Sequence, residues 1–450
     1  MIKNHLNPII FVFLLILYIV GQFLIGTYLP ADKQFYFNTP SDIDFLYYGA
    51  IINTLTDTFP PQNPAFGGEK LTQPYLHYYP AALLGKLANP YNSIRILNVL
   101  YLIILGLVLR KYFPEKYGFA LLILFGASTV GAGLNSMGVD FIARGFTHAP
   151  FFILLTVAFF SPSRIIRYSA IFLAALVNGY LMVMVIIFLA VRAVWKRDRE
   201  NILLLASGLV GILAASIFIT SAVSEKPFYF ILTESFYFDP AENLIHATPF
   251  FILIFFYRQR EMILLFVIAL LFGSFIHYNP FFAIFMIYYA GAMLVAGGES
   301  VHKKSRFALH LVLALLFIGF LFSGYSKYRI RGDGYYPRFD SKLESSFNWI
   351  RANTEPQACF MAVTADAYEI ALVMQYRPVY LGFIGHVAHL GINWKERYNN
   401  ITRTYRMGLI PSEVDYIFYG PIEQRYFPGI SLPYPVVYRD DYVTICRSAT

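Results

Sequence analysis

Two aspartates lie two residues apart, just after the first long apolar run of the chain has ended. The stretch SDIDFLYYG starts at Ser41 and contains Asp42 and Asp44. A carboxylate in such a place can accept or orient the proton of an attacking alcohol or amine. The same residues fit a helix N-terminus, because Thr39, Pro40 and Ser41 form a capping pattern. The stretch predicts either a base, with Asp42 first and Asp44 second as base or metal partner, or a helix cap.

An aromatic, hydrogen-bonding cluster follows these aspartates. The stretch FPPQNPAFGGEKLTQPYLHYYPAAL contains Tyr75, His77, Tyr78 and Tyr79 near its end. Its prolines and glycines are expected to break any helix. Imidazole and phenol groups can donate hydrogen bonds that stabilise an anion formed in a reaction. His77 and Tyr78 are the candidates from this cluster.

Later loops supply further charged candidates. GVDFIARGFTH contains Asp140 and Arg144, four residues apart and therefore on one helix face, which indicates either a salt bridge or an arginine that binds phosphate. His148, at the end of this stretch, is expected to be an interfacial residue. The loop 222–246 adds side chains that contact lipid phosphate or acceptor, or are merely solvated: Lys226, Glu234, Asp239, Glu242 and His246.

The C-terminal part contains charged and imidazole side chains that we expect to form a polar seam against the first loop. These residues are Arg377, His386, His389, Glu396 and Arg397. His386 and His389 could bind a metal ion, but no third ligand follows at a suitable spacing, so docking of the domain is favoured. Cys359 and Cys446 belong to no ligand or redox motif, and two buried thiols in strands are favoured over a disulfide.

The composition indicates which elements position these residues. The 450 residues are 57% hydrophobic and only 14% charged, with a mean hydropathy of +0.54, which is typical of a multi-pass membrane protein. Apolar segments are expected at 9–29, 94–109, 117–134, 146–160, 165–191, 202–219, 247–257, 262–276, 281–296 and 307–324. Segment 165–191 is interpreted as two short helices hinged near Asn178 and Gly179, which gives about eleven membrane segments.

The basic residues between these segments predict the topology. With the N-terminus inside the cell, every Lys/Arg cluster lies on the cytoplasmic side, whereas one long span at 165–191 would place residues 192–199 outside. The first helix is expected to be retained, because no small-residue cleavage site precedes Pro30. The outer side then receives residues 30–92, 135–148, 222–246 and everything after 324. The +8 net charge is explained by topology, and no nucleic-acid partner is expected.

The soluble C-terminal part is predicted to be a small α/β domain, with a boundary between a membrane module at 1–325 and a domain at 326–450. Helices are expected at 341–353, 366–376 and 395–408, and strands at 358–364, 378–383 and 414–420, with a hairpin at 436–446.

The first loop and the tail resemble a known group of enzymes. Asp42, FPPQNP at residues 59–64 and GGEKLTQPYLHYYPAAL resemble the first outer loop of prokaryotic GT-C fold glycosyltransferases, which use polyprenyl-phosphate-linked sugars. NWIRANTEPQACFMAV, YRPVYLGFIGHVAHLGINWKERYNNI, VDYIFYG and VVYRDDYVTI resemble the outer-face domain of the same group. The resemblance implies that Asp42 is the base or the carboxylate that orients the acceptor. Many relatives carry a histidine four residues after this aspartate. This chain has Leu46 there, which argues against a His-assisted or metal-binding role at this position.

The expected fold is mainly α: a polytopic GT-C-like transmembrane bundle with a small C-terminal α/β domain on the outer face. The expected function is transfer of a sugar from a polyprenyl-phosphate donor to a glycan, glycolipid or protein acceptor, with inversion, in the cytoplasmic (inner) membrane of a prokaryote. A divalent metal stays open as a cofactor. The alternative of a flippase for a lipid-linked precursor predicts charged residues within the spans and an internal repeat. Apart from Arg95 near a helix end, the charged residues lie in the loops, and the sequence shows no internal repeat. A non-catalytic glycolipid-binding scaffold is the other alternative.

Overall fold

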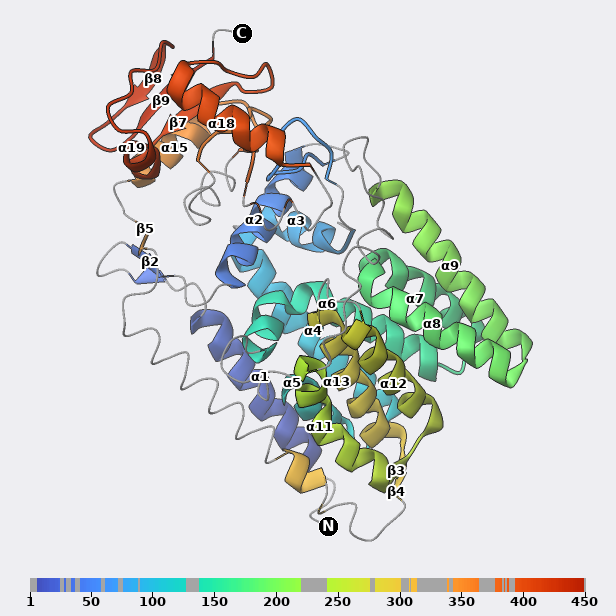
Figure 1. Ribbon diagram of the computed structural model, residues 1–450. Helices are drawn as coiled ribbons and strands as arrows, with labels where there is room; N and C mark the ends of the chain where they lie inside the picture. The colour runs from blue at the N-terminus through green and yellow to red at the C-terminus, as the bar shows by residue number, and fades with distance from the viewer. Residues whose placement is uncertain are drawn as a thin grey trace. The chain divides into compact units, whose positions relative to one another are not determined.

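Figure 1 shows the protein as a computed structural model. The structure describes residues 6–24, 28–29, 34–36, 41–57, 61–71, 76–87, 90–126, 137–219, 241–275, 280–300, 307, 309–313, 338–339, 343–363, 377–382, 384, 387 and 393–448. Two compact units make up the chain. The first contains Met1–Leu24, Arg95–Ile217 and Leu232–Tyr335, and the second contains Ile25–Ile94, Phe218–Ile231 and Tyr336–Thr450.

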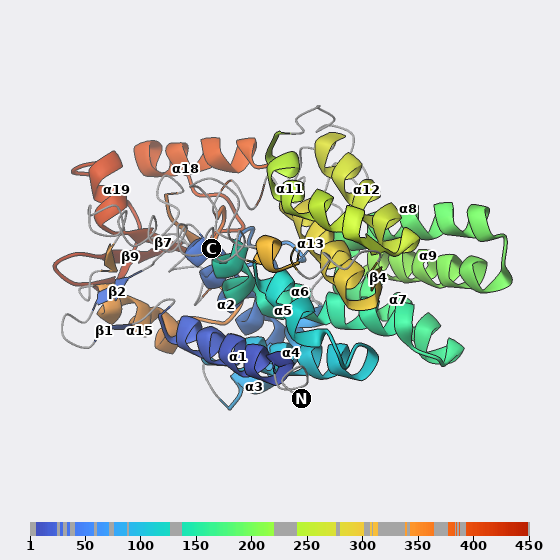
Figure 2. The ribbon, with the colours of Figure 1, turned by 90° about the horizontal axis from the view of Figure 1, so that it is seen from below.

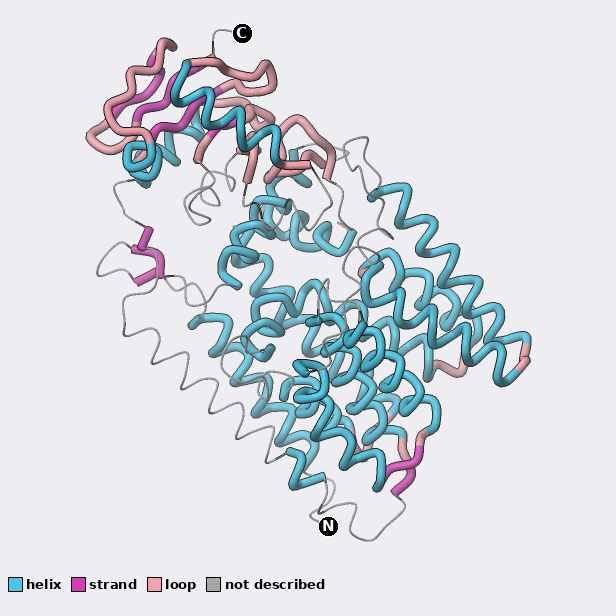
Figure 3. The backbone as a smooth tube through the Cα atoms, in the orientation of Figure 1, coloured by secondary structure: helices cyan, strands magenta, loops and turns pink. Residues whose placement is uncertain are grey.

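In the described part of the first unit, apolar helices form a bundle and the strands form one short ribbon (Figures 1 and 3). Its helices are α1 (Leu6–Leu24), α4 (Pro90–Tyr112, which begins in the second unit), α5 (Tyr117–Gly126), α6 (Met137–Phe160), α7 (Arg164–Val177), α8 (Gly179–Lys196), α9 (Arg199–Ile219), α11 (Ala241–Phe256), α12 (Arg260–Phe275) and α13 (Pro280–Gly297). The ribbon pairs β3 (Tyr257–Arg258) with β4 (Glu299–Ser300).

Helix α13 lies at the centre of this bundle. It packs against α5, α11 and α12, and all of its residues from 283 to 296 are buried, which agrees with a sequence that is apolar around the whole helix. Tyr289 stacks on Phe152 of α6 with ring centroids 5.1 Å apart. The Phe250 ring packs directly against Gly291. A Cβ at this position would lie 2.2 Å from a ring atom, so only glycine leaves enough room.

Two described helical stretches are long and apolar enough to cross a membrane, Asn92–Tyr112 and Arg199–Ser216. Shorter apolar stretches are Leu6–Ile16, His148–Phe160, Ala247–Phe256 and Ala283–Gly297. The expectation of about eleven membrane segments stays a prediction.

The predicted break inside segment 165–191 is confirmed. Asn178 has extended backbone angles (φ −147°, ψ 91°), and its side chain accepts a hydrogen bond from the Leu181 amide, which starts α8. At the end of α7 that is remote from Asn178, Arg164 and Arg167 of its first turn form ion pairs with Glu200, which lies in the first turn of α9. Because α9 follows α8 after a turn of two residues, α7 and α8 run in opposite directions.

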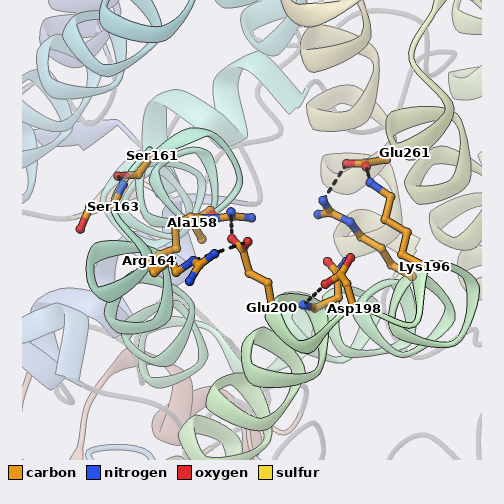
Figure 4. Close-up of polar contacts among 11 residues, drawn as sticks. Ala158, Ser161, Ser163, Arg164, Lys196, Asp198, Glu200 and Glu261 are labelled. Atoms are coloured by element: carbon orange, nitrogen blue, oxygen red, sulfur yellow. Dashed lines mark hydrogen bonds and ion pairs between the residues drawn. The ribbon is translucent and has the colours of Figure 1, made fainter.

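The described basic loops gather at one end of the bundle. Lys116 donates to the Gly298 carbonyl at 2.8 Å, and its ammonium lies 5.6 Å from the Tyr257 ring centroid. Asn7 of α1 donates to the Glu115 carbonyl at 2.6 Å. Glu261, which follows the β3 ribbon, pairs with Arg192 and Lys196 of α8 (Figure 4). The positive-inside rule requires the basic loops to lie at one end of the bundle, as they do. That this end faces the cytoplasm stays a prediction.

The second unit contains the N-terminal extension and the C-terminal part. Its first elements are β1 (Tyr28–Leu29), β2 (Gln34–Tyr36), α2 (Ser41–Asp57), the 3₁₀ turn η2 (Leu76–Tyr78) and α3 (Tyr79–Gly85). Its later elements are β5 (Arg338–Phe339), α15 (Glu344–Asn353), β6 (Phe360–Met361), α18 (Lys395–Met407), β7 (Tyr416–Tyr419), α19 (Pro421–Tyr426), β8 (Val436–Arg439) and β9 (Thr444–Arg447).

The C-terminal sheet has the strand order β6-β7-β9-β8, in which β6 and β7 are parallel and the other neighbours antiparallel. Phe347 of α15 stacks on Phe418 of β7, with centroids 6.0 Å apart and rings 3° from coplanar. A second antiparallel ribbon joins β1, β2 and β5. The predicted helices at α15 and α18, strand β7 and the β8–β9 hairpin are confirmed.

Some expectations for this unit need correction. We expected no helix in this stretch, but residues 76–85 are helical. Pro80 is compatible with α3 because it lies in the first turn, where a backbone N–H has no partner within the helix. The strand expected at 378–383 is reduced to one bridge between Phe360 and Val379. Helix α19 was not expected. The helix expected at 366–376 and the boundary near residue 326 lie outside the described residues.

Candidate functional site

Helix α2 places both candidate aspartates in its first turn. It begins at Ser41, so Asp42 and Asp44 follow directly, and Asp44 lies one turn before Tyr48. The side chains of residues 41–46 fall outside the described part of the chain, so the choice between a base and a cap stays a prediction.

The aromatic cluster of the first loop packs on this helix one turn further along. The Tyr78 ring lies 5.7 Å from the Tyr48 ring and 4.2 Å from the His77 ring, measured between centroids. Tyr78 and Tyr47 are both buried. The structure therefore brings His77 and Tyr78 beside the helix that carries the two aspartates, although they follow its last residue, Asp57, by about twenty residues.

Between these elements, residues 61–71 form a compact turn held by its own backbone. Asn63 is fully buried: its amide donates to Glu69 O at 2.7 Å, and its side-chain oxygen accepts from the Ala65 amide at 3.0 Å. Leu71 closes the turn with a 2.8 Å bond to Pro61 O. Gly68 has φ +83°, a left-handed conformation that glycine adopts without strain. The turn has a defined shape that can dock as a whole.

This turn docks on the C-terminal part through main-chain hydrogen bonds. Val379 N donates to Pro64 O at 2.9 Å, Gly67 N donates to Val379 O at 2.7 Å, and Gly382 N donates to Ala65 O at 2.7 Å. Val379 also bridges Phe360 of β6. The turn therefore follows residues 379–382 as an added edge beside the C-terminal sheet.

Arg397 of α18 holds the same turn with its side chain. One guanidinium nitrogen donates to Gly67 O at 2.8 Å and to Tyr380 O at 2.6 Å. The guanidinium lies 3.6 Å from the Phe66 ring centroid and 4.4 Å from that of Tyr380, so both rings make cation–π contacts with it. Burial lowers the pKa of Arg397, but an arginine remains charged under all ordinary conditions. The predicted seam thus contains one described residue that contacts the first loop.

Close approach explains the glycine at position 67. A Cβ there would lie 2.5 Å from Cys359 Sγ and 3.2 Å from Val379 O. Burial raises the pKa of the Cys359 thiol to about 12, so the thiol stays protonated and packs as a small apolar group. Cys446 is also a free, buried thiol, and it lies on β9, which β7 separates from β6. The prediction of two buried thiols is confirmed.

The other seam residues have different positions. Arg377 donates to Arg351 O at 3.0 Å, to Thr354 O at 2.6 Å and to Thr354 Oγ1 at 2.9 Å, so it binds the carbonyls at the end of α15. This contact is structural and does not reach the first loop. Glu396 is exposed, and His386 and His389 lie outside the described residues.

The charged candidates of the later loops are placed only by their backbone. Asp140 and Arg144 lie one turn apart on α6, and His246 lies in the first half of α11, whereas Lys226 falls outside the described part. His148 is buried inside the bundle, and its expected place at a membrane boundary stays a prediction. It is 5% exposed, its Nδ1 lies 3.4 Å from the Asn178 side-chain nitrogen, and its ring lies 4.4 Å from the Phe285 ring.

Within the described ranges, no group of three or more His, Cys, Asp or Glu side chains is arranged to hold a metal ion. Sequence reasoning missed Phe66, Gly67 and Tyr380, which form the contact with Arg397. The double glycine of AFGGE was the available signal, because adjacent glycines mark a turn with close backbone approach.

Solved structures resemble the chain over nearly its whole length. One is the crystal structure of ArnT from Cupriavidus metallidurans bound to undecaprenyl phosphate, with 12% identity, a TM-score of 0.52, and coverage of 98% of this chain and 97% of that one. Another is ArnT from the same organism in the apo state, with 13% identity, a TM-score of 0.54 and the same coverage. No protein-family model and no curated protein sequence matches the chain. The chain therefore has the fold of ArnT, which confirms at the level of fold the GT-C-like architecture that the sequence predicted.

Proposed function

We propose that this protein is a membrane glycosyltransferase that takes its sugar from a polyprenyl-phosphate-linked donor. The observation that carries the proposal is the fold shared with ArnT over 98% of the chain, including a structure with bound undecaprenyl phosphate. The aspartates in the first turn of α2 and the aromatic cluster packed on that helix supply a plausible reaction centre. The acceptor is a glycan, glycolipid or protein on the outer face of the cytoplasmic membrane.

In the proposed reaction, Asp42 takes the proton of the acceptor alcohol or amine as its oxygen or nitrogen attacks the anomeric carbon. The bond from that carbon to the phosphate oxygen breaks, and the polyprenyl phosphate leaves with the electron pair. Attack opposite the leaving group inverts the anomeric carbon. Arg144 on α6, with His77 and Tyr78, stabilises the phosphate charge, because a guanidinium and hydrogen-bond donors favour the developing anion.

Docking of the first loop on the C-terminal part fits this reaction. The turn 61–71 lies between α2 and η2 in the chain, and four hydrogen bonds attach it to Val379, Gly382 and Arg397. Since catalysis requires groups held within a fraction of an ångström, a loop anchored at its centre can keep Asp42, His77 and Tyr78 in a constant arrangement.

The test is release of free polyprenyl phosphate, measured by mass spectrometry. Detergent-solubilised protein receives a panel of polyprenyl-phosphate sugars together with a crude envelope extract as acceptor. Asp42→Asn is expected to keep expression and lipid binding while release falls at least 100-fold, since removal of a general base costs about 10²–10⁴ in rate. Asp44→Asn, in the same helical turn, is the matched comparison, and Glu344→Gln on α15 is the remote control.

A fully active Asp42→Asn protein would remove this residue from the role of base. Bound lipid without release under any donor would favour the flippase or the non-catalytic scaffold.

A further inference from the structure

A basic surface lies where α7 and α9 begin, at the end of α6. We call it the α7/α9 basic edge, and it comprises Arg164, Arg167 and Arg199 (Figure 4 shows the neighbouring contacts). Arg167 donates to Ala158 O at 2.8 Å and pairs with Glu200, so its charge is used within the fold. Arg164 is 3.9 Å from the same carboxylate with 75% of its side chain exposed, and Arg199 is also exposed. Glu200 therefore cannot neutralise all three arginines.

The imbalance extends over the neighbouring helix ends. The eight cationic residues are Arg164, Arg167, Arg192, Lys196, Arg197, Arg199, Arg258 and Arg260, and the three acidic ones are Asp198, Glu200 and Glu261. Glu261 is shared between Arg192 and Lys196. Asp198 accepts from the Asn201 amide at 2.7 Å and from its side chain at 2.5 Å, and these hydrogen bonds lower its pKa. Five positive charges remain in excess.

Helix stability does not account for the position of these arginines. Arg164 and Arg167 lie in the first turn of α7, which contains no acidic residue, and Arg199 opens α9. The N-terminal end of a helix carries partial positive charge, so cations there are unfavourable unless an anion is close by. Glu200 offsets part of this interaction, and an external anion would offset the rest together with the mutual repulsion of the arginines.

Apolar side chains border the arginines on the same helical turns. Ile165 is 77% exposed, Ile166 50% and Ile202 53%, and each lies within three residues of Arg164 or Arg199 in the chain. Helices α7, α8 and α9 lie side by side at the margin of the bundle in both ribbon views (Figures 1 and 2). Gly208 and Gly211 of α9 allow close packing, since Cβ atoms there would lie 2.7 Å from Met182 and Ala175 side chains. The edge combines exposed guanidinium groups with an exposed apolar surface.

We propose that the α7/α9 basic edge binds the phosphate of an anionic glycerophospholipid in the adjacent leaflet, with acyl chains along Ile165, Ile166 and Ile202. Guanidinium groups match phosphate oxygens in pairs, and basic residues beside membrane helices attract anionic headgroups. The site differs from the proposed donor site. Arg144 lies sixteen residues before Phe160, the last residue of α6, which corresponds to about 24 Å along a helix. The inference goes beyond sugar transfer and does not require it.

The experiment measures lipid retention and affinity for the full-length protein in detergent by native mass spectrometry. Phosphatidylglycerol is titrated against phosphatidylcholine, inorganic phosphate and undecaprenyl phosphate, each as a separate arm. The test variant is Arg164→Gln/Arg199→Gln, which spares the Arg167–Glu200 pair. Arg403→Gln/Arg406→Gln, two exposed arginines of α18, is the matched control, and Arg164→Lys/Arg199→Lys preserves the charge.

Wild type is expected to bind phosphatidylglycerol in preference to phosphatidylcholine. The glutamine variant should lose roughly tenfold or more in affinity, because two basic residues near an anionic headgroup are removed. The α18 control should match wild type, and the lysine variant should stay within about threefold of it, because its charge is unchanged. Equal phosphatidylglycerol binding by the glutamine variant and wild type would overturn the proposal. It would also be overturned by equal competition from inorganic phosphate, which indicates a free-anion site, or by a loss of undecaprenyl phosphate binding in the glutamine variant as large as its loss of phosphatidylglycerol binding.

If the glutamine variant does not fold, Arg199→Gln alone is used, because Arg199 makes no ion pair among the described residues. It should weaken phosphatidylglycerol binding by a smaller factor of at least threefold. Loss of sugar transfer with lipid retention intact would count against the proposed function and leave the lipid site standing.

Discussion

The Arg397 guanidinium donates a 2.8 Å hydrogen bond to the carbonyl of Gly67, 330 residues earlier in the chain. The same group lies between the rings of Phe66 and Tyr380. One buried side chain therefore joins the loop that follows α2 to the C-terminal sheet.

Replacing Arg397 should release the first loop. Arg397→Ala leaves the Gly67 and Tyr380 carbonyls without their charged donor and removes two cation–π contacts, which we expect to cost about 3 kcal/mol. Hydrogen exchange at residues 61–71 should rise, and polyprenyl phosphate release should fall. Arg397→Lys should restore part of both, since it keeps the charge but not the planar fork. Arg403→Ala on the exposed face of α18 is the control, and unchanged exchange at 61–71 in Arg397→Ala would contradict the anchoring role.

Gly67→Ala should disturb the same contact by steric overlap. The added methyl would lie 2.5 Å from Cys359 Sγ, so the turn must move or the thiol must rotate. We expect a loss of about 1–3 kcal/mol, as for other overpacked sites. Cys359→Ala removes the sulfur, so the double variant should regain part of the stability, and a double-mutant cycle on thermal unfolding measures the coupling. Gly68→Ala is the comparison, because its surroundings are open and only its φ of +83° is strained. Strict additivity of Gly67→Ala and Cys359→Ala would show that the two residues are not in contact.

The Cys359 thiol should resist alkylation until the domain unfolds. Its folded pKa is about 12 because burial disfavours the thiolate, whereas an unfolded cysteine has a value of 9.0. Below pH 9 both states hold the proton and stability is unaffected. Between about 9 and 12 the unfolded state loses the proton first, so stability falls as pH rises. Iodoacetamide labelling at pH 8 with and without denaturant, read by peptide mass, checks this. Rapid labelling of the native protein would contradict burial of the thiol.

The hairpin of α7 and α8 makes a topological prediction. Ser163→Cys and Arg197→Cys flank the pair and should react with an impermeant maleimide from the same side of sealed vesicles. A single long span would place them on opposite sides. The background is low because both native cysteines are buried. If the N-terminus lies inside the cell, as we expect, this common side is the cytoplasmic one. Labelling of inverted and of right-side-out vesicles distinguishes the cytoplasmic side from the outer side.

The sequence predicted the helices and the C-terminal hairpin well, because a long apolar run must form a helix in lipid and an alternating run with turn residues forms paired strands. The hinge at Asn178 was recognisable because Asn-Gly favours a break. The burial of His148 was not recognisable, because the apolar segment was expected to start at 146, whereas α6 begins at Met137 and continues three turns before that histidine. The proximity of His77 and Tyr78 to α2 followed from their shared loop. The contacts of Arg397 could not be predicted, since they join residues hundreds of positions apart.

The docked turn also closes an exposed margin of the C-terminal sheet. Beyond β6 the backbone of Val379 has its amide and carbonyl engaged by Pro64 and Gly67. Without residues 61–71, this row of donors and acceptors would be open to another chain, and open strand edges promote self-association. Residues 343–448 expressed alone should therefore aggregate or dimerise edge to edge, and a synthetic peptide spanning 61–71 should suppress this. The first loop would then protect its own fold partner from polymerisation, apart from any part it has in sugar transfer.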